Sequence, residues 1–381
     1  MRFEFTAEQL LIQRTARDFA QQELKPGVIE RDEHQKFPAE QIKKLGELGF
    51  MGMMVDPLYN GSGLDAVSYM LTIKELSKID ASAAVVVSVN NSLVCYGLEE
   101  YGTEYQKENF LKPLAAGEKI GAFCLSEPEA GSDATSLRTT AIDMGDHYLL
   151  NGTKNWITNG SSASTYLVIA QTDAAKRHQG INALIVEKGM EGFTIGPKEN
   201  KLGIRGSDTH SLMFSDVKIP KENRIGEEGT GFRFAMKTLE GGRIGIAAQA
   251  LGIATGAYEL ALRYSKERKA FGKSLAEHQA IQFKLADMAT EIEAAKLLCI
   301  KAAWLKDQGL PFAQASSMAK LFASQIAMKT TIEAVQIHGG YGYVKEYHVE
   351  RLMRDAKITQ IYEGTSEIQR IVISREVLKK N

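Results

Sequence analysis

The stretch that decides the fold is the run IQFKLADMATEIEAAKLLCIKA, residues 281–302. Its apolar residues recur in alternating steps of four and three: Ile281, Leu285, Met288, Ile292, Ala295, Cys299 and Ala302. Because this spacing places the apolar side chains on one stripe of a helix, it predicts a helix that packs in a bundle. The stripe indicates architecture and core packing, and it carries no chemistry of its own.

Three zones extend outward from this stretch. Residues 231–381 continue the helical pattern and predict a C-terminal helical domain. Residues 1–120 also read as helices, and Thr6 with Gln9 forms a capping-box pattern ahead of the first one. Residues 121–230 instead hold short β-rich runs with no long helical pattern between them, which predicts a central antiparallel sheet or small barrel. The fold class is therefore α+β, mostly α.

The individual elements follow from local patterns. Helices are predicted over residues 66–79 and 83–101, with an exposed turn marked by Pro57, Gly61 and Gly63. The predicted strands are 147–150, 165–170, 183–187 and 211–219, and turn signals such as Asn151-Gly152, Asn159-Gly160 and Gly180 separate them.

Composition narrows the class of protein. The 381 residues are 44% hydrophobic and 24% charged, with a net charge of −1, so no charge excess points to nucleic acid or to an anionic membrane. The spacings of Cys95, Cys124 and Cys299 fit neither a disulfide framework nor a metal site, which indicates buried thiols in a reducing compartment. The N-terminus has no apolar signal region, and no run appears long enough for a membrane span. We expect a cytoplasmic protein, or a mitochondrial matrix protein if the chain is a processed eukaryotic one.

Two segments of the β-zone carry unusual polar groups. Residues 123–133, FCLSEPEAGSD, form a kinked loop whose backbone N–H groups and serine hydroxyls can hold a polar ring or an anion, although an ordinary Asp/Ser turn has the same pattern. In residues 155–160, NWITNG, Trp156 and Thr158 project to the same side of a strand end and can hold a flat heterocycle. Plain core packing of Trp156 is the alternative.

Two segments of the helical zone are equally distinctive. Residues 268–273, RKAFGK, place cations near a helix end, where they suit a phosphate or simply complement the helix dipole. In residues 361–370, IYEGTSEIQR, Ser366 with Gln369 predicts the start of a helix, so Glu363 lies on an exposed bend just before it. A carboxylate there can complement the dipole or act as a positioned base.

Together, in this order, the four segments resemble the acyl-CoA dehydrogenase family over nearly the full length of the chain. The matching motifs are Leu125-Ser126-Glu127-Pro128 with Gly131-Ser132-Asp133, Trp156-Ile157-Thr158, residues 268–273, Gln336-Ile337-His338-Gly339-Gly340, and residues 361–370. Residues 89–93, VNNSL, resemble the short-chain (butyryl-CoA) members in a region that forms the floor of their acyl pocket.

The resemblance implies a helical domain, a β-domain and a C-terminal four-helix bundle. It also implies the cofactor FAD, an acyl-CoA substrate, electron transfer to an electron-transferring flavoprotein, and a homotetramer built as a dimer of dimers. The family holds its catalytic glutamate at one of two positions, which are here Glu363 and Gly242, just before Arg243. Glycine cannot act as a base, so the resemblance assigns Glu363 as the catalytic residue.

The residues that the resemblance assigns to FAD are Phe123, Leu125, Ser126, Gly131, Ser132, Trp156, Ile157, Thr158, Arg268, Phe271, Gln279, Gln336, Gly339, Gly340, Thr365 and Glu367. Those that it assigns to the acyl-CoA are Ser132, Glu240, Arg243, Tyr362 and Gly364. No residue is assigned to a metal.

The expected activity is FAD-dependent α,β-dehydrogenation of a short-chain acyl-CoA to the trans-2-enoyl-CoA, as in fatty acid β-oxidation. Glu363 removes the α-proton, and the β-hydride passes to flavin N5. The alternatives are a branched-chain or medium-chain dehydrogenase, an acyl-CoA oxidase, and a non-catalytic flavin or acyl-CoA binding protein.

Overall fold

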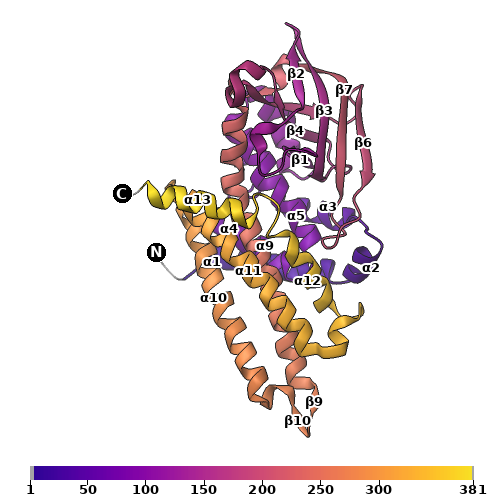
Figure 1. Ribbon diagram of the computed structural model, residues 1–381, viewed down its shortest axis with the longest axis vertical. Coiled ribbons are helices and arrows are strands. Elements are labelled where there is room, and N and C mark those ends of the chain that lie inside the picture. The colour runs from indigo at the N-terminus through magenta and orange to yellow at the C-terminus, as the bar shows by residue number, and fades with distance from the viewer. Residues whose placement is uncertain (1–3, 380–381) are drawn as a thin grey trace.

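The computed structural model describes residues 4–379 of the chain. Figure 1 shows a sheet at one end of the long axis and long helices that run from it toward the other end. The N-terminal helices pack against both the sheet and the C-terminal helices, so segments from both ends of the sequence share one core.

The N-terminal part of the chain is helical, as predicted. Gln9 N–H donates to Thr6 Oγ1 at 3.1 Å and Thr6 N–H donates to Gln9 Oε1 at 3.0 Å, which confirms the capping box. The prediction for 83–101 is also confirmed, although α5, η3 and α6 form one continuous helix whose middle turn is a π-helix. The main elements are α1 (Ala7–Phe19), η1 (Ala20–Leu24), α2 (Val28–Glu33), α3 (Ala39–Glu47), α4 (Ala66–Ser77), α5 (Ala81–Val89), η3 (Asn90–Cys95), α6 (Tyr96–Tyr101), η4 (Lys107–Leu111) and α8 (Lys112–Ala115).

The central sheet has eight strands in the order β6-β7-β3-β2-β4-β5-β8, and β1 pairs with β4. Each predicted strand is present, and the sequence prediction missed β1, β2, β6 and β8. The strands are β1 (Gly121–Cys124), β2 (Thr140–Asp143), β3 (His147–Thr158), β4 (Thr165–Gln171), β5 (Ile181–Glu187), β6 (Phe193–Lys198), β7 (Thr209–Pro220) and β8 (Arg224–Ile225).

Two features of this sheet differ from the prediction. The β1–β4 and β2–β4 pairings are parallel, so the sheet is mixed rather than purely antiparallel. The sheet is also open, because the pairing ends at β6 on one side and at β8 on the other, and the barrel-like shape is not confirmed.

The C-terminal part is built on three long helices that lie side by side in Figure 1. The apolar stripe of residues 281–302 is buried or half-buried throughout, which confirms the predicted packing face. The helices are α9 (Gly231–Glu267), α10 (Gln279–Asp307), α11 (Ala313–His338), α12 (His348–Ile358) and α13 (Ser366–Leu378), and a small hairpin, β9 (Lys269–Ala270) with β10 (Lys273–Ser274), joins α9 to α10.

Two expectations from composition can be compared with the structure. All three cysteines are buried free thiols, as predicted. The expectation that no run reaches the length of a membrane span is wrong, because Ala81–Tyr101 and Gly231–Glu267 are long and apolar enough by length and composition. Their most apolar windows are 94% and 78% buried inside the protein, which is how core helices of folded domains also appear.

Candidate functional site

Glu363 lies in the short loop between α12 and α13, where it turns inward against α9. Its backbone has a φ of 52°, and Gly364 follows with a φ of 92°. A Cβ added to Gly242 on α9 would lie 2.2 Å from Glu363 Oε2, so the missing side chain of this glycine leaves the space that the carboxylate occupies. Glu363 Oε2 is buried and has no hydrogen-bond partner among residues 4–379. The prediction of an exposed bend is therefore wrong for the carboxylate, because contact with a distant helix buries it.

The electrostatic surroundings of the Glu363 carboxyl group suit it to act as a proton acceptor. Burial raises the pKa of Glu363 to about 7, and the positive charges of Lys320 and Arg243 oppose that rise. Burial also lowers the pKa of Lys320 to about 7 and lowers the pKa of Arg243. A carboxyl group whose pKa lies near neutrality can take a proton and release it again at ordinary pH, as a general base must.

The loop around Glu363 is held from three helices. The Gln369 side chain on α13 donates from Nε2 to Gly364 O at 2.9 Å and to Glu363 O at 3.3 Å. The Lys320 ammonium on α11 donates to Gly364 O at 2.5 Å, and the Tyr362 hydroxyl donates to the Gln249 side chain on α9. These bonds fix the backbone on both sides of the carboxylate.

The start of α13 differs from the prediction by one residue. Thr365 is the N-cap, and its hydroxyl accepts from Ile368 N–H at 3.4 Å, whereas Ser366 is the first helical residue. The capping box predicted for Ser366 and Gln369 does not form, because the Gln369 side chain binds the loop carbonyls instead.

A buried ion pair holds the loop that follows β1 against β3. Lys154 is fully buried, and its ammonium contacts Glu127 Oε1 at 2.7 Å and donates to Leu125 O at 3.0 Å. Asn155 N–H donates to Ser126 O at 2.9 Å, and Thr139 N–H donates to Glu127 Oε1 at 3.0 Å. The predicted flavin loop and the predicted flavin strand are thus tied together by polar contacts.

Trp156 sits at a β-bulge on this strand. Its φ is 57°, the pairing of β3 with β7 shifts between Lys154 and Ile157, and its side chain is 56% exposed. Thr158 is half-buried, and Ile157 is only 2% exposed because it packs in the core of the sheet. Core packing of Trp156, the alternative that the sequence left open, is excluded. The structure therefore brings Trp156, Thr158 and the Ser126 loop to one place, with Ile157 turned inward.

A second group of predicted residues lies around the other end of α9. A hollow of about 510 Å³ is lined by Tyr264, Arg268, Leu275, Ile337, His338, Gly339, Gly340, Tyr341 and Val344. It brings together Arg268, Gly339 and Gly340, which come from two distant parts of the sequence. The Arg268 guanidinium lies 5.6 Å from the centre of the Tyr341 ring. Sequence reasoning missed the aromatic lining of Tyr264 and Tyr341, since neither stands in a motif.

The remaining predicted site residues lie outside these two groups. Phe123 is buried and packs near Phe234, and Leu125 is half-buried. Glu240 forms an ion pair with Lys237 at 3.1 Å. The predicted residues that stand exposed outside the hollow are Gly131, Ser132, Phe271, Gln279, Gln336 and Glu367, of which Phe271 is 96% exposed.

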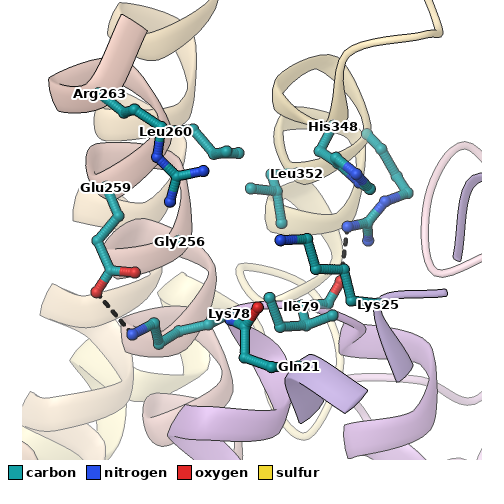
Figure 2. Close-up of a pocket in the computed structure, with 11 residues that line it drawn as sticks. Gln21, Lys25, Lys78, Ile79, Gly256, Glu259, Leu260, Arg263, His348 and Leu352 are labelled. Carbon is teal, nitrogen blue, oxygen red and sulfur yellow. Dashed lines mark hydrogen bonds and ion pairs between the residues drawn. The ribbon is translucent and has the colours of Figure 1, made fainter. Parts of the chain in front are cut away.

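Another hollow, of about 60 Å³, lies among four elements and contains none of the predicted site residues. Figure 2 shows Lys25 and Arg263 on opposite sides of it, and Lys78 joined to Glu259 at 2.6 Å. Burial and the neighbouring cations Arg351 and Lys25 lower the pKa of His348 there to about 4. The residues that line it are Gln21, Lys25, Lys78, Ile79, Gly256, Glu259, Leu260, Arg263, His348, Arg351 and Leu352.

Comparison with known proteins identifies the family of the chain. The family models for the N-terminal, middle and C-terminal domains of acyl-CoA dehydrogenases match residues 6–118, 122–217 and 229–378. The short-chain specific acyl-CoA dehydrogenase of Clostridium acetobutylicum is 52% identical over 379 residues, which span 100% of both chains.

Two solved structures are similar along the whole chain. The butyryl-CoA dehydrogenase of Megasphaera elsdenii has a TM-score of 0.98 and 50% identity, and the match covers 99% of this chain and 100% of that one. A chain from a structural study of the electron transferring flavoprotein of Acidaminococcus fermentans, concerned with flavin-based electron bifurcation, has a TM-score of 0.98, 51% identity and 100% coverage of both chains. From the family models, these identities and the shared fold, we conclude that the chain is an enzyme of the acyl-CoA dehydrogenase family.

Proposed function

We propose that this enzyme converts a short-chain acyl-CoA, of the butyryl-CoA type, to the trans-2-enoyl-CoA, and that Glu363 is the base that removes the α-proton. The observation that carries the proposal is a buried carboxyl group, with a pKa raised to about 7, whose Oε2 has no partner among the described residues. Such a group is deprotonated often enough to act and is not neutralised by an ion pair.

The loop also offers a donor for the charge that develops on the thioester oxygen. The backbone N–H of Glu363 donates to no protein group within residues 4–379. An unpaired N–H beside the base can bind an enolate oxygen and lower the barrier to deprotonation. Tyr362 and Gly364 flank this N–H, and the positive charge of Arg243 lies near the carboxyl group.

The chain's residues fit a bound FAD. Trp156 leaves an aromatic face exposed beside Thr158, and the loop at Ser126 is fixed next to them. We propose that these residues hold the flavin ring, and that Arg268 with Gly339 and Gly340 holds the phosphate and adenine end of a cofactor in the large hollow. FAD, when bound, supplies the acceptor for the β-hydride.

The residues beside the Glu363 carboxylate support the proposal that the substrate has a short acyl chain. A Cβ at Gly242 would lie 2.8 Å from Leu93 Cδ2, so Leu93 packs against the same turn of α9 as Glu363. We propose that Leu93 and its neighbours on η3 limit the length of the acyl chain. One methylene changes binding in such a pocket by about 1–3 kcal/mol, so branched or slightly longer chains should be turned over more slowly rather than refused.

We further propose that the protein acts as a homotetramer, a dimer of dimers, and passes electrons to an electron-transferring flavoprotein in the cytoplasm, or in the mitochondrial matrix if the chain is a processed eukaryotic one. The study that contains the similar Acidaminococcus fermentans chain concerns such a flavoprotein. Phe271 and Gln279 are exposed in the described structure, which leaves them available to a neighbouring subunit.

Anaerobic bleaching of the purified yellow enzyme by butyryl-CoA tests the proposal. Glu363→Gln should retain FAD and lose bleaching by at least about 10²-fold, because general base catalysis contributes about that much. Glu293→Gln, at an exposed glutamate of α10, is the control and should bleach normally. Bleaching of the Glu363→Gln protein at the control rate would refute the assignment of the base, and oxygen consumption without an added acceptor would indicate an oxidase.

A further inference from the structure

Lys320 on α11 carries a buried ammonium group that has no role in the proposed proton and hydride transfers. The residue is 1% exposed, and its side chain reaches from the helix to the loop that carries Glu363. Burial of a charged group is costly unless the group is hydrogen-bonded or paired, so a fully enclosed lysine needs a compensating partner.

The partners of this ammonium lie in the Glu363 loop. Its Nζ donates to Gly364 O at 2.5 Å, and no carboxylate is within ion-pair distance of it among the residues that the structure describes. The charge that most stabilises the ammonium is that of Glu363. Lys320 therefore contacts the loop by one hydrogen bond and acts on the carboxylate through space.

The other titratable groups around the carboxylate come from every element packed there. Arg243 on α9 and Lys320 on α11 favour the ionised carboxylate. Tyr69 on α4 is buried and Tyr362 in the same loop is half-buried. Loss of solvent contact, with a smaller contribution from the charge of Glu363, raises the pKa of both phenols, so they remain neutral. Arg243 donates to Ser317 Oγ at 3.3 Å, one helical turn before Lys320. Among these groups, Lys320 is the only cation that is also bonded to the catalytic loop itself.

We propose that Lys320 is a positioning residue for the dehydrogenation. Its hydrogen bond to Gly364 O holds the loop so that the Glu363 carboxylate faces Gly242, and its ammonium form favours the proton-accepting form of that carboxylate. The proposal rests on Glu363 being the base, and it adds a role for a residue that never touches the substrate.

Three substitutions separate the charge from the hydrogen bond. Lys320→Met removes both, Lys320→Gln removes the charge but keeps a donor, and Lys320→Arg keeps both. The control is Lys301→Met, which removes the same charge from an exposed site on α10. The measurement is the rate of anaerobic flavin bleaching by butyryl-CoA as a function of pH, with FAD content checked for each protein.

Loss of the cation should raise the pKa of the base. A neighbouring opposite charge lowers a carboxyl pKa by about 1–3 units, so loss of the charge on Lys320, which lowers the pKa of Glu363, should lower the bleaching rate at pH 7 by about tenfold. Activity should return as the pH is raised, because a base with a higher pKa is deprotonated only at higher pH. Lys320→Gln should show this pH shift, Lys320→Met should add a fall in the maximal rate, and Lys320→Arg should restore the wild-type profile.

Unchanged pH profiles in Lys320→Met and Lys320→Gln would overturn the proposal, and loss of bleaching in Glu363→Gln would still support the base. If the single variants do not fold, the double variant Lys320→Met with Glu363→Gln should fold with FAD, because it removes the buried ammonium together with the carboxylate whose charge stabilises it. Failure of that double variant to fold, while Glu363→Gln folds, would show that Lys320 serves the core alone and would also overturn the proposal.

Discussion

Gly242→Ala should disable the enzyme although it leaves the residue proposed as the base, Glu363, in the sequence. The added methyl carbon would lie 2.2 Å from Glu363 Oε2 and 2.8 Å from Leu93 Cδ2. Non-bonded carbon and oxygen atoms normally stay about 3.4 Å apart, so the carboxylate must move by about 1 Å. The loop cannot yield freely, because Lys320 and Gln369 hold the carbonyl of Gly364.

The size of the effect follows from this displacement. Misplacement of a reacting group by about 1 Å costs about 10²-fold in rate, which corresponds to about 2.7 kcal/mol in the barrier. Overpacking destabilises a core by about 1–3 kcal/mol, and the higher helix propensity of alanine offsets up to about 1 kcal/mol of that loss. We therefore expect a folded, yellow protein with a modestly lower thermal midpoint and a bleaching rate about 10²-fold below wild type.

Gly241→Ala is the matched control for this prediction. It places the same methyl group one residue earlier on α9, where the nearest atoms are Lys306 Nζ at 3.7 Å and Ser92 O at 4.0 Å, both ordinary contacts. This variant should bleach at a rate of the wild-type order and unfold at an equal or higher temperature. If Gly242→Ala and Gly241→Ala have the same bleaching rate, the carboxylate does not occupy the space beside Gly242 during the reaction.

Three further outcomes follow from the structure. The folded-state pKa of Glu363 is about 7 against an ordinary 4.5, so ionisation of this group costs the folded protein up to about 3 kcal/mol. In thermal unfolding scans, Glu363→Gln should therefore gain stability relative to wild type as the pH rises from 4.5 through 7. A stability difference that is the same at pH 4.5 and pH 8 would contradict the burial of this carboxyl group. Lys154→Met should lose about 3–5 kcal/mol of unfolding free energy in a denaturant titration, because it leaves Glu127 as an unpaired buried charge, and a loss under 1 kcal/mol would show that the pair is not buried. Because Trp156 is 56% exposed, Trp156→Ala without cofactor should have an unfolding free energy within about 0.5 kcal/mol of that of wild type. The same variant should bind FAD more weakly in an absorbance titration. Unchanged FAD affinity would show that Trp156 is not part of the flavin site.

Local patterns were sufficient for much of the fold. The stripe from Ile281 to Ala302 and the capping box at Thr6 depend on neighbours within a few residues, so the sequence alone predicts them. The strands β1 and β6 escaped prediction for opposite reasons. β1 is four buried residues paired in parallel with β4, which shows no alternation, and β6 is mostly half-exposed at the sheet edge, which shows little hydrophobicity.

The loop that carries Glu363 could be predicted only in part from the sequence. The motif at residues 361–370 indicates a carboxylate before a helix, but its burial depends on a glycine of α9 far away in the sequence. The helix start was misplaced by one residue because Thr365 and Ser366 are both good caps, and only the tertiary contact of Gln369 decides between them. The cluster of Tyr264, Arg268 and Tyr341 likewise comes together only when α9 meets the end of α11.

The central claim is that Glu363 removes the α-proton of a bound acyl thioester. Exchange of the α-hydrogens with deuterated solvent tests this directly, using an analogue of butyryl-CoA with sulfur in place of the β-methylene, which cannot lose a β-hydride. Mass spectrometry should show that the wild-type holoenzyme incorporates deuterium at C2, and that Glu363→Gln, with the same FAD content, incorporates it at least about 10²-fold more slowly. Equal exchange by the two proteins would mean that another group takes the proton.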